Sequence, residues 1–367
     1  MNLRTGITTG TCAAGAAKAC ALNLAGAGCE RVSVRNLEGR EFVLETFREG
    51  ECLGVVKSSG DDRADITDGV RVLARLERLG NLRPRDGEAG RGRSREGEAG
   101  RGSLVFCAGE GIGTVTLPGL KLPPGEPAIN PVPREMITRA IREVLPGEAL
   151  RITLSIPGGR ELARRTFNPR LGIIGGLSIL GTTGIVKPMN EQALLDSLTL
   201  ELSMIHALGF SEVYITFAGT GEKFTRKLFG VSTRNIIQCG NYPGYVLEEC
   251  ARLGFTHAII CGHPGKLLKV AGGSFNTHSK VSGGSLEALC TQLAILGTSP
   301  ELVRRVYHAN TSREAIDIVR REGYSLVWRV LAEIVSRKCR ERTCQSLKVS
   351  AVFFDGEGQV LGGYHDE

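Results

Sequence analysis

The chain has 367 residues, of which 41% are hydrophobic and 23% charged, so it is long enough for two globular domains with buried cores. Aromatic residues make up only 5%, with a single tryptophan, which argues against the stacking surfaces that bind nucleic-acid bases. The net charge of +7 is compatible with an acidic small molecule, a polyanion or no specific partner.

Cysteine usage and hydropathy favour a cytoplasmic protein. The eleven cysteines contain no C-x-x-C pair, so we predict neither a metal site nor a disulfide framework. Most of them stand among apolar residues, as buried thiols do in a reducing compartment. The opening MNLRTGITTG lacks a signal-peptide pattern. The longest uncharged run, 171–186, is short and rich in glycine, so no membrane-spanning segment is expected.

The first part of the chain alternates helical and strand patterns. A helix of very small side chains is expected at 11–25, with Thr8, Thr9 and Thr11 available to cap its start. The further elements expected are strands at 32–36 and 41–47, an amphipathic element at 66–79, a strand at 104–107, a helix near 134–145 and a strand at 151–156. This mixture predicts an α+β domain over 1–165.

A polar, glycine-rich segment interrupts that domain at 81–103. It contains GEAGRG twice, at 87–92 and 97–102, and its six arginines are offset by four acidic residues. Such composition predicts a disordered surface loop. The alternative is an RNA-binding tract, against which the near-balanced charge and the absence of aromatic residues both argue.

The second part of the chain has the rhythm of strands that alternate with helices. Apolar runs predict strands at 213–217, 235–238 and 258–261, with helices at 190–208, 222–229 and 243–253. This pattern predicts an α/β domain over 166–340 with a mainly parallel, Rossmann-like sheet. The run 347–354, followed by a turn at 356–358, predicts a C-terminal hairpin within 341–367.

Small residues follow each predicted strand of the second domain. The three stretches are Ala-Gly-Thr-Gly at 218–221, Cys-Gly-Asn at 239–241 and Cys-Gly-His-Pro-Gly-Lys at 261–266. In an open α/β sheet the carboxyl ends of the strands hold the ligand, and glycine lets the backbone approach it closely. Each loop can equally be a tight turn, but three at one sheet edge favour a binding site. No G-x-G-x-x-G or Walker A motif is present, which disfavours ordinary NAD binding and NTP hydrolysis.

Two histidines and one proline-rich stretch are further candidates. His263 and His278 stand among Gly, Pro, Ser and Thr, where a catalytic or ligand-binding role and a purely loop-stabilising role both remain open. The stretch 120–134 contains five prolines together with Glu126, Asn130 and Arg134. It fits either a preorganised binding surface or a structural connection.

Taken together, several long blocks resemble the cobalt-precorrin-5B C1-methyltransferase family of anaerobic cobalamin biosynthesis. The blocks occur in the family's order and cover most of the chain: RTGITTGTCAAGAAKA (4–19), GIGTVTLPGLKLPPGEPAINPVPREMI (111–137), FNPRLGIIGGLSILGTTGIVKPM (167–189), CGNYPG (239–244), GHPGKLLKVAGG (262–273) and NTHSK (276–280). Two departures are visible. The loop 81–103 is longer than is usual for the family, and Ser282-Gly283 stands where the family usually has Ala-Asp.

The resemblance implies methyl transfer from S-adenosylmethionine to C1 of cobalt-precorrin-5B, which gives cobalt-precorrin-6A. It implies two domains, with the donor in the Rossmann-like one and cobalt present only as part of the substrate. A homo-oligomer is one option, and no nucleic-acid partner is expected. The nicotinamide-dependent precorrin reductases of the same pathway and basic RNA-binding proteins are the alternatives.

The site residues expected on these grounds fall into three groups. The candidate catalytic residues are His263, as a general base, and Lys266, as a clamp for a substrate carboxylate. The candidates for binding the methyl donor are Gly219, Gly221, Gly240, Asn241 and Gly262. The candidates for binding the substrate are Thr8, Thr9, Glu126, Asn130, Arg134, Thr182, Thr183 and His278.

Overall fold

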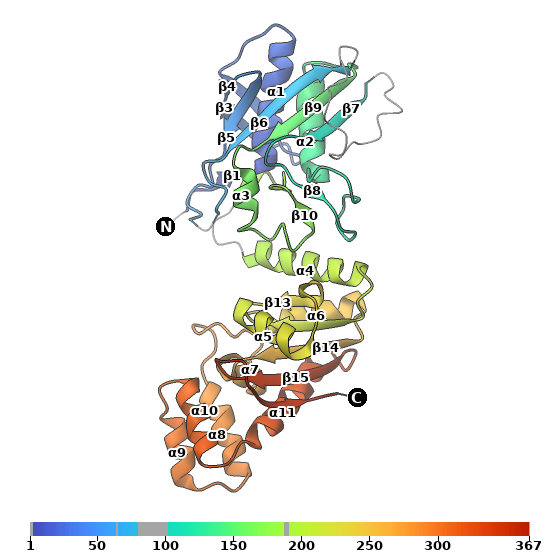
Figure 1. Cartoon of the computed structure of the whole chain (residues 1–367). Coiled ribbons are helices and arrows are strands. Elements are labelled where there is room, and N and C mark those ends of the chain that lie inside the picture. The colour runs from blue at the N-terminus through green and yellow to red at the C-terminus, as the bar shows by residue number, and fades with distance from the viewer. Residues whose placement is uncertain (1–2, 64, 80–101, 187–190, 367) are drawn as a thin grey trace. The chain divides into compact units, whose positions relative to one another are not determined.

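The computed structural model describes residues 3–63, 65–79, 102–186 and 191–366. The chain is α/β with mixed sheets and folds as two compact units, Met1–Ala193 and Leu194–Glu367 (Figure 1). The first unit extends beyond the boundary expected at 165, because the short strands that follow pair back onto it. The predicted loop 81–103 lies almost wholly outside the described residues.

The first unit is built around a five-stranded sheet in the order β4-β5-β6-β9-β7. All neighbours in it are antiparallel except β7 and β9, which run parallel. The described residues of this unit also form three two-stranded pairs, β1-β11, β2-β3 and β8-β10. The elements of the first unit are β1 (Gly6–Ile7), α1 (Thr9–Leu24), β2 (Arg31–Arg35), β3 (Glu41–Glu45), β4 (Phe47–Glu49), β5 (Cys52–Val56), β6 (Arg71–Arg78), β7 (Leu104–Ala108), β8 (Thr114–Val115), α2 (Pro131–Arg142), β9 (Leu150–Ser155), α3 (Gly159–Ala163), β10 (Ile173–Ile174) and β11 (Ile185–Val186).

Helix α1 is the centre of this unit's core. It packs against β5 and β6 and lies beside α2 (Figure 1). Its small side chains permit this approach: a Cβ added to Gly15 would lie 3.2 Å from a methyl of Val55 in β5 and 2.5 Å from one of Leu44 in β3. The helix begins where the sequence places the caps, since the Thr8 side chain accepts a hydrogen bond from the Thr11 N–H.

The second unit contains a five-stranded sheet in the order β13-β12-β14-β15-β16. The first four strands are parallel, and β16 is antiparallel to β15. The C-terminal hairpin is therefore part of this sheet. The elements of the second unit are α4 (Glu191–Ala207), β12 (Glu212–Thr216), α5 (Gly219–Phe229), the 3-10 turn η3 (Thr233–Asn235), β13 (Ile236–Gln238), α6 (Pro243–Leu253), β14 (His257–Gly262), α7 (Pro264–Ala271), α8 (Ser285–Ile295), α9 (Pro300–Tyr307), α10 (Ser312–Arg321), α11 (Val327–Arg342), β15 (Lys348–Phe354) and β16 (Val360–Tyr364).

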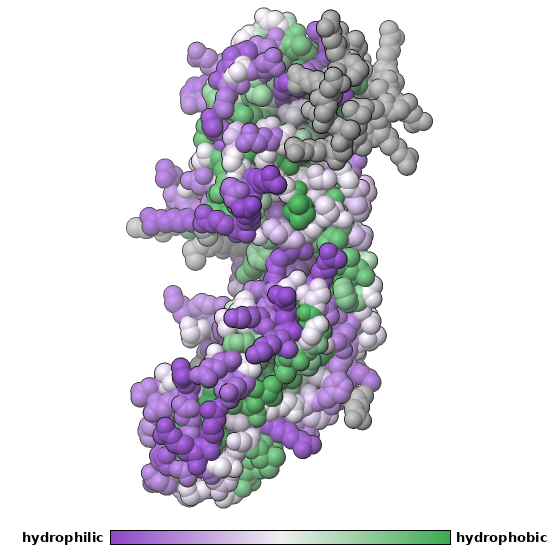
Figure 2. Space-filling view, viewed as in Figure 1, coloured by the Kyte–Doolittle hydropathy of each residue, from purple (hydrophilic) through white to green (hydrophobic). Residues whose placement is uncertain are grey.

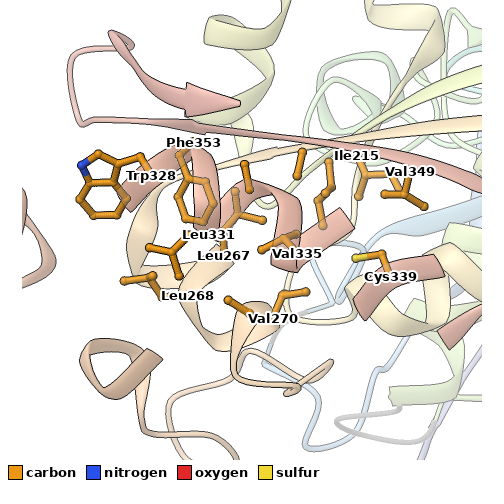
Figure 3. Close-up of a cluster of buried hydrophobic side chains, with 14 of the residues drawn as sticks. Ile215, Leu267, Leu268, Val270, Trp328, Leu331, Val335, Cys339, Val349 and Phe353 are labelled. Atoms are coloured by element: carbon orange, nitrogen blue, oxygen red, sulfur yellow. The ribbon is translucent and has the colours of Figure 1, made fainter. Parts of the chain in front are cut away.

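The two faces of this sheet are covered unequally. A large core joins α6, α7 and α11 to one face, and Trp328, Leu331 and Val335 of α11 lie near Leu267 and Phe353 within it (Figure 3). A smaller cluster around Tyr214 and Phe354 lies on the other face, where α5 contributes Phe224. The visible surface over α9 and α10 is strongly hydrophilic (Figure 2).

Two further features can be compared with the sequence analysis. The amphipathic element at 66–79 is a strand, β6, whose long pairing with β9 stabilises the sheet. Among the described residues no helix is long and apolar enough to cross a membrane.

Candidate functional site

The strand order of the second unit defines where a ligand would bind. Strand β12 connects through α5 to β13 on one side, whereas the chain then passes through α6 to β14 on the other side of β12. The order reverses between β12 and β14, and ligands of open parallel sheets bind at the carboxyl ends of the strands at such a point. The loops 217–219 and 262–266 flank this position.

The glycines of these loops have distinct structural reasons. Gly221 and Gly262 are buried, and an added Cβ would lie 3.3 Å from Thr216 and 2.7 Å from Phe217, respectively. Gly240 has a φ of +58°, which disfavours other residues. Gly219 alone is exposed at the start of α5, and its nearest neighbour would be Gln238 at 3.8 Å. Of the glycines expected to bind the donor, Gly219 and Gly240 leave space for a ligand, since a Cβ added to Gly240 would meet no atom within 4 Å.

His263 caps the helix that follows β14. Its Nδ1 accepts a hydrogen bond from the Gly265 N–H at 3.2 Å. Burial lowers the pKa of His263, an effect that the nearby Asp355 carboxylate partly offsets, so the neutral ring is favoured. Because Nδ1 accepts, the proton of the neutral ring resides on Nε2, which makes Nε2 a hydrogen-bond donor. This geometry suits a donor better than the general base expected from the sequence.

Asp355 is a polar group at this edge that sequence reasoning missed. It follows β15, the neighbour of β14, and receives hydrogen bonds from the N–H groups of Glu357 and Gln359 and from Arg320. Burial alone would raise the pKa of Asp355, but these donors bring it below its ordinary value. The signal was available, since an Asp-Gly pair follows the apolar run 347–354.

Lys266 reaches from the first turn of α7 to the loop after β13. Its Nζ lies 2.6 Å from the Asn241 Oδ1 and 3.3 Å from the Thr277 carbonyl oxygen. Lys269, one turn further along the helix, donates to the same Thr277 oxygen at 3.2 Å and to the Ser282 carbonyl oxygen at 2.8 Å. The structure thus brings together Lys266, expected as a substrate clamp, and Asn241, expected to bind the donor, and adds Lys269.

His278 lies in the loop that the two lysines hold. Its ring is exposed, and its Nδ1 accepts a hydrogen bond from the Lys280 N–H at 3.1 Å. This is the same pattern as at His263. At the other end of the edge, the Gln238 amide donates to the Glu222 carboxylate at 2.7 Å, which joins the end of β13 to the first turn of α5.

The remaining predicted residues belong to the first unit. The Thr9 hydroxyl accepts a hydrogen bond from the Leu180 N–H at 3.0 Å, and Gly10 donates to the Leu180 carbonyl oxygen. Thr8 donates through its backbone to Gly184 and caps α1 through its side chain. Both threonines are buried, so these hydrogen bonds fasten the 178–184 segment to the start of α1.

The start of α2 lies beside the same segment. The Asn130 N–H donates to the Ile179 carbonyl oxygen, while the Asn130 side chain is exposed and makes no capping hydrogen bond. Thr182 is exposed, and the Thr183 carbonyl oxygen accepts from Asn36 at 2.7 Å. Asn130 and Thr182 are the residues of this group whose side chains face solvent.

Glu126 and Arg134 form a half-buried pair. The Arg134 guanidinium lies 2.8 Å from the Glu126 carboxylate and donates to the carbonyl oxygens of Ile129 and Pro127. It also stacks over the Phe106 ring, 5.3 Å from the centroid. These contacts stabilise the loop before α2, whether or not the pair also meets a ligand.

Two hollows among the described residues of the first unit differ in size. One, of about 160 Å³, lies between the β2–β3 turn and α2, beside Asn36 and Met136. The other, of about 390 Å³, lies beside Cys29, Thr46 and Phe47. The first volume is below the range of roughly 300–1,000 Å³ that is usual for sites of drug-sized ligands, and the second is near its lower end.

Comparison with known proteins places the chain in a family. The family described as CbiD matches residues 1–188, and the one described as CbiD, C-terminal domain, matches 276–365. Curated relatives named cobalt-precorrin-5B C(1)-methyltransferase are similar over nearly the whole length. The protein from Thermoanaerobacter sp. is 41% identical over 95% of this chain and 91% of its own. Those from Alkaliphilus metalliredigens and Moorella thermoacetica are 38% identical over 98% of this chain and 92% and 94% of their own.

A crystal structure described as a cobalamin biosynthesis protein from Archaeoglobus fulgidus is 26% identical. The match covers 76% of this chain and 83% of that one, with a TM-score of 0.40. The family match over half of the chain and the near full-length relatives lead to one conclusion: the chain belongs to the CbiD family.

Proposed function

We propose that this chain is a methyltransferase that moves a methyl group from S-adenosylmethionine to C1 of cobalt-precorrin-5B and forms cobalt-precorrin-6A. One observation carries the proposal: relatives with that activity in their name share 38–41% identity over 95–98% of this chain. Cobalt enters as part of the substrate, so the reaction asks the protein chiefly to position a methyl donor against a ring carbon.

The parallel sheet of the second unit serves, in this proposal, as a Rossmann-like domain for the donor. Its strand order reverses between β12 and β14, and the exposed Gly219 opens the start of α5 beside that point. Glu222 and Gln238 fit the hydroxyls of a ribose, since a carboxylate near the end of the first strands is the usual partner of such hydroxyls. The donor supplies an electrophilic methyl group.

The residues around this edge then take defined roles. His263 presents its Nε2–H to a bound ligand, and Lys266, in the first turn of the same helix, holds Asn241 in the loop after β13. Gly221 and Gly262 shape the loops, whereas Gly219 and Gly240 leave open space for the donor. The exposed ring of His278, in the 276–283 loop, leaves its Nε2 to the solvent.

The first unit provides the second half of the proposal. Asn130 and Thr182 face solvent at the start of α2 and in the neighbouring segment, and we assign them to the substrate. Thr8, Thr9 and Thr183 hold that segment in place, and the Glu126–Arg134 pair fixes the loop before α2.

Anaerobic turnover of authentic substrate tests the function. Cobalt-precorrin-5B and S-adenosylmethionine carrying a labelled methyl group should give a product heavier by one methyl, with the label at C1. A product without added methyl, or consumption of a nicotinamide cofactor instead, would exclude the methyltransferase and favour a reductase.

A structure with S-adenosylhomocysteine bound tests the position of the donor. The nucleoside should lie over the carboxyl ends of β12 and β14, with its ribose near Glu222. Binding confined to the first unit would leave the activity intact and refute the proposed donor site.

A further inference from the structure

Two lysine ammonium groups lie close together at the carboxyl edge of the sheet. Lys266 and Lys269 are one turn apart in α7, and each lies within 3.3 Å of the carbonyl oxygen of Thr277. Like charges at this spacing repel each other, and the half-buried setting weakens the screening by water. In keeping with this, burial and then the charge of Lys269 lower the pKa of Lys266.

The protein itself offers these groups only neutral partners. The contacts of Lys266 are the Asn241 amide oxygen and a carbonyl oxygen, and those of Lys269 are two carbonyl oxygens. Within the described part of the chain, neither ammonium forms an ion pair with a carboxylate. An ammonium has three N–H groups, and these contacts occupy two on each lysine. One donor on each lysine therefore remains for a ligand.

The 276–283 loop, whose carbonyl oxygens accept hydrogen bonds from both lysines, also contains a buried hydroxyl without a hydrogen-bond partner in the part of the chain that the structure describes. The Ser282 hydroxyl is buried, with the residue only 9% exposed, and it has no hydrogen-bond partner among the described residues. The carbonyl oxygen of the same residue is a partner of Lys269. Buried hydroxyls in native proteins are nearly always paired, so an orphaned one indicates a group that the ligand-free chain does not supply.

We propose that Lys266 and Lys269, held by Asn241, Thr277 and Ser282, form a binding site for a ligand carboxylate. The site takes an anion because its free groups are N–H and O–H donors and its net charge is positive. It joins the loops after β13 and β14 and extends to the 276–283 loop, so an anion there would tie these segments together. Lys269 becomes a binding residue that neither the motif nor the strand-end rule identified.

Two ligands of the proposed reaction carry carboxylates, and here the inference rests on the proposed function. One is the amino-acid part of the methyl donor, and the other is the rim of the tetrapyrrole. Binding measurements distinguish them without turnover. S-adenosylhomocysteine carries the amino-acid carboxylate, 5′-methylthioadenosine lacks it, and cobyrinic acid is a corrin that presents several carboxylates.

The test variant is Lys269→Gln, with Lys348→Gln as its matched control. The control removes the same charge from an exposed position at the amino end of β15, the opposite edge of the sheet. Isothermal titration of both variants should show about 10- to 100-fold weaker binding of one carboxylate ligand to Lys269→Gln, as expected for the loss of a charged hydrogen bond. Lys269→Arg should restore most of this affinity.

The pattern of losses identifies the source. If only S-adenosylhomocysteine binds more weakly while 5′-methylthioadenosine is unchanged, the carboxylate belongs to the donor. If only cobyrinic acid binds more weakly, it belongs to the tetrapyrrole. Equal losses for S-adenosylhomocysteine and 5′-methylthioadenosine, or affinities equal to those of the control, would overturn the site.

A measurement on the unaltered protein covers the case in which Lys269→Gln does not fold. The affinity for the carboxylate ligand should fall as salt rises, whereas that for 5′-methylthioadenosine should stay level. If every ligand shows the same salt dependence, no carboxylate site exists. Because these readouts do not involve methyl transfer, they can fail while the proposed activity stands, and the reverse also holds.

Discussion

Replacing His263 by asparagine separates the two tasks that its ring can perform. The Nδ1 atom accepts a hydrogen bond from the Gly265 N–H and caps α7, while no described residue accepts from the Nε2–H, which we propose faces a ligand. Asparagine places an amide oxygen near the position of Nδ1 and is among the best N-cap residues. His263→Asn should therefore keep the cap and lose the Nε2–H.

The expected stability change is small for this variant and larger for alanine. Since the cap is retained, the free energy of unfolding of His263→Asn should stay within about 0.5 kcal/mol of the parent, whereas His263→Ala should lose about 1 kcal/mol. If Nε2–H donates to a charged ligand group, losing it costs roughly 1.5–3 kcal/mol, or about 10- to 100-fold in kcat/KM. A general base would cost about 10²- to 10⁴-fold in kcat.

Urea unfolding and anaerobic steady-state kinetics together decide the outcome. His263→Gln is the reciprocal control, because its longer side chain carries an amide N–H near the position of Nε2 but does not cap the helix well. We expect it to be less stable than His263→Asn and more active. Full activity in His263→Asn would refute any role of the ring in ligand binding or chemistry.

The lowered pKa of His263 also predicts how stability depends on pH. The folded state resists protonation of the ring, whereas the unfolded chain accepts a proton near the ordinary value of about 6.5. The contribution is therefore complete above about 6.5 and is lost as the pH falls toward the folded pKa. His263→Asn should flatten this part of the stability profile.

Three further predictions concern the first unit. Lys57 is 3% exposed and lies 2.5 Å from Asp65, so Lys57→Met should destabilise the unit by about 3–5 kcal/mol in urea unfolding. Burial alone would raise the pKa of Asp65, but hydrogen bonds from Lys57, Thr67 and Ser59 bring it to about 2, so the stabilisation from this carboxylate should be complete above the ordinary pKa of 3.8 and be lost as the pH falls from there to about 2. A double-mutant cycle of Arg134→Met and Glu126→Gln should give a coupling of about 0.5–3 kcal/mol, and a value near zero would contradict the pair. Replacing 81–100 with a short Gly/Ser linker should leave the melting temperature nearly unchanged, provided that Gly102 and Ser103, which accept hydrogen bonds from Arg142, are kept.

Local signals in the sequence were sufficient for most helices and strands. The strands expected at 213–217, 235–238 and 258–261 correspond to β12, β13 and β14 within one residue at each end, because each is an apolar run bounded by turn residues. Helix α6 occupies the expected 243–253, with Pro243 at its first position and Gly254 after its end.

The rest depends on contacts between residues that are distant along the chain. The short strands β10 and β11 join the first unit because they pair with β8 and β1, and strands of two residues have no periodicity to detect. Asp355 and Lys269 were missed for the same reason. Asp355 approaches His263 only because β15 pairs with β14, and Lys269 reaches the site only through the fold of the 276–283 loop.

The two candidate histidines show why geometry changes the chemistry read from a motif. In each, Nδ1 accepts an N–H from two residues further on, Gly265 for His263 and Lys280 for His278. A neutral ring bound in this way carries its proton on Nε2, so Nε2 cannot accept another. For either ring to act as a base through Nε2, its capping hydrogen bond must break. Beside Lys266 and Lys269, these rings make the edge a set of donors, which suits the recognition of an anionic ligand better than the removal of a proton.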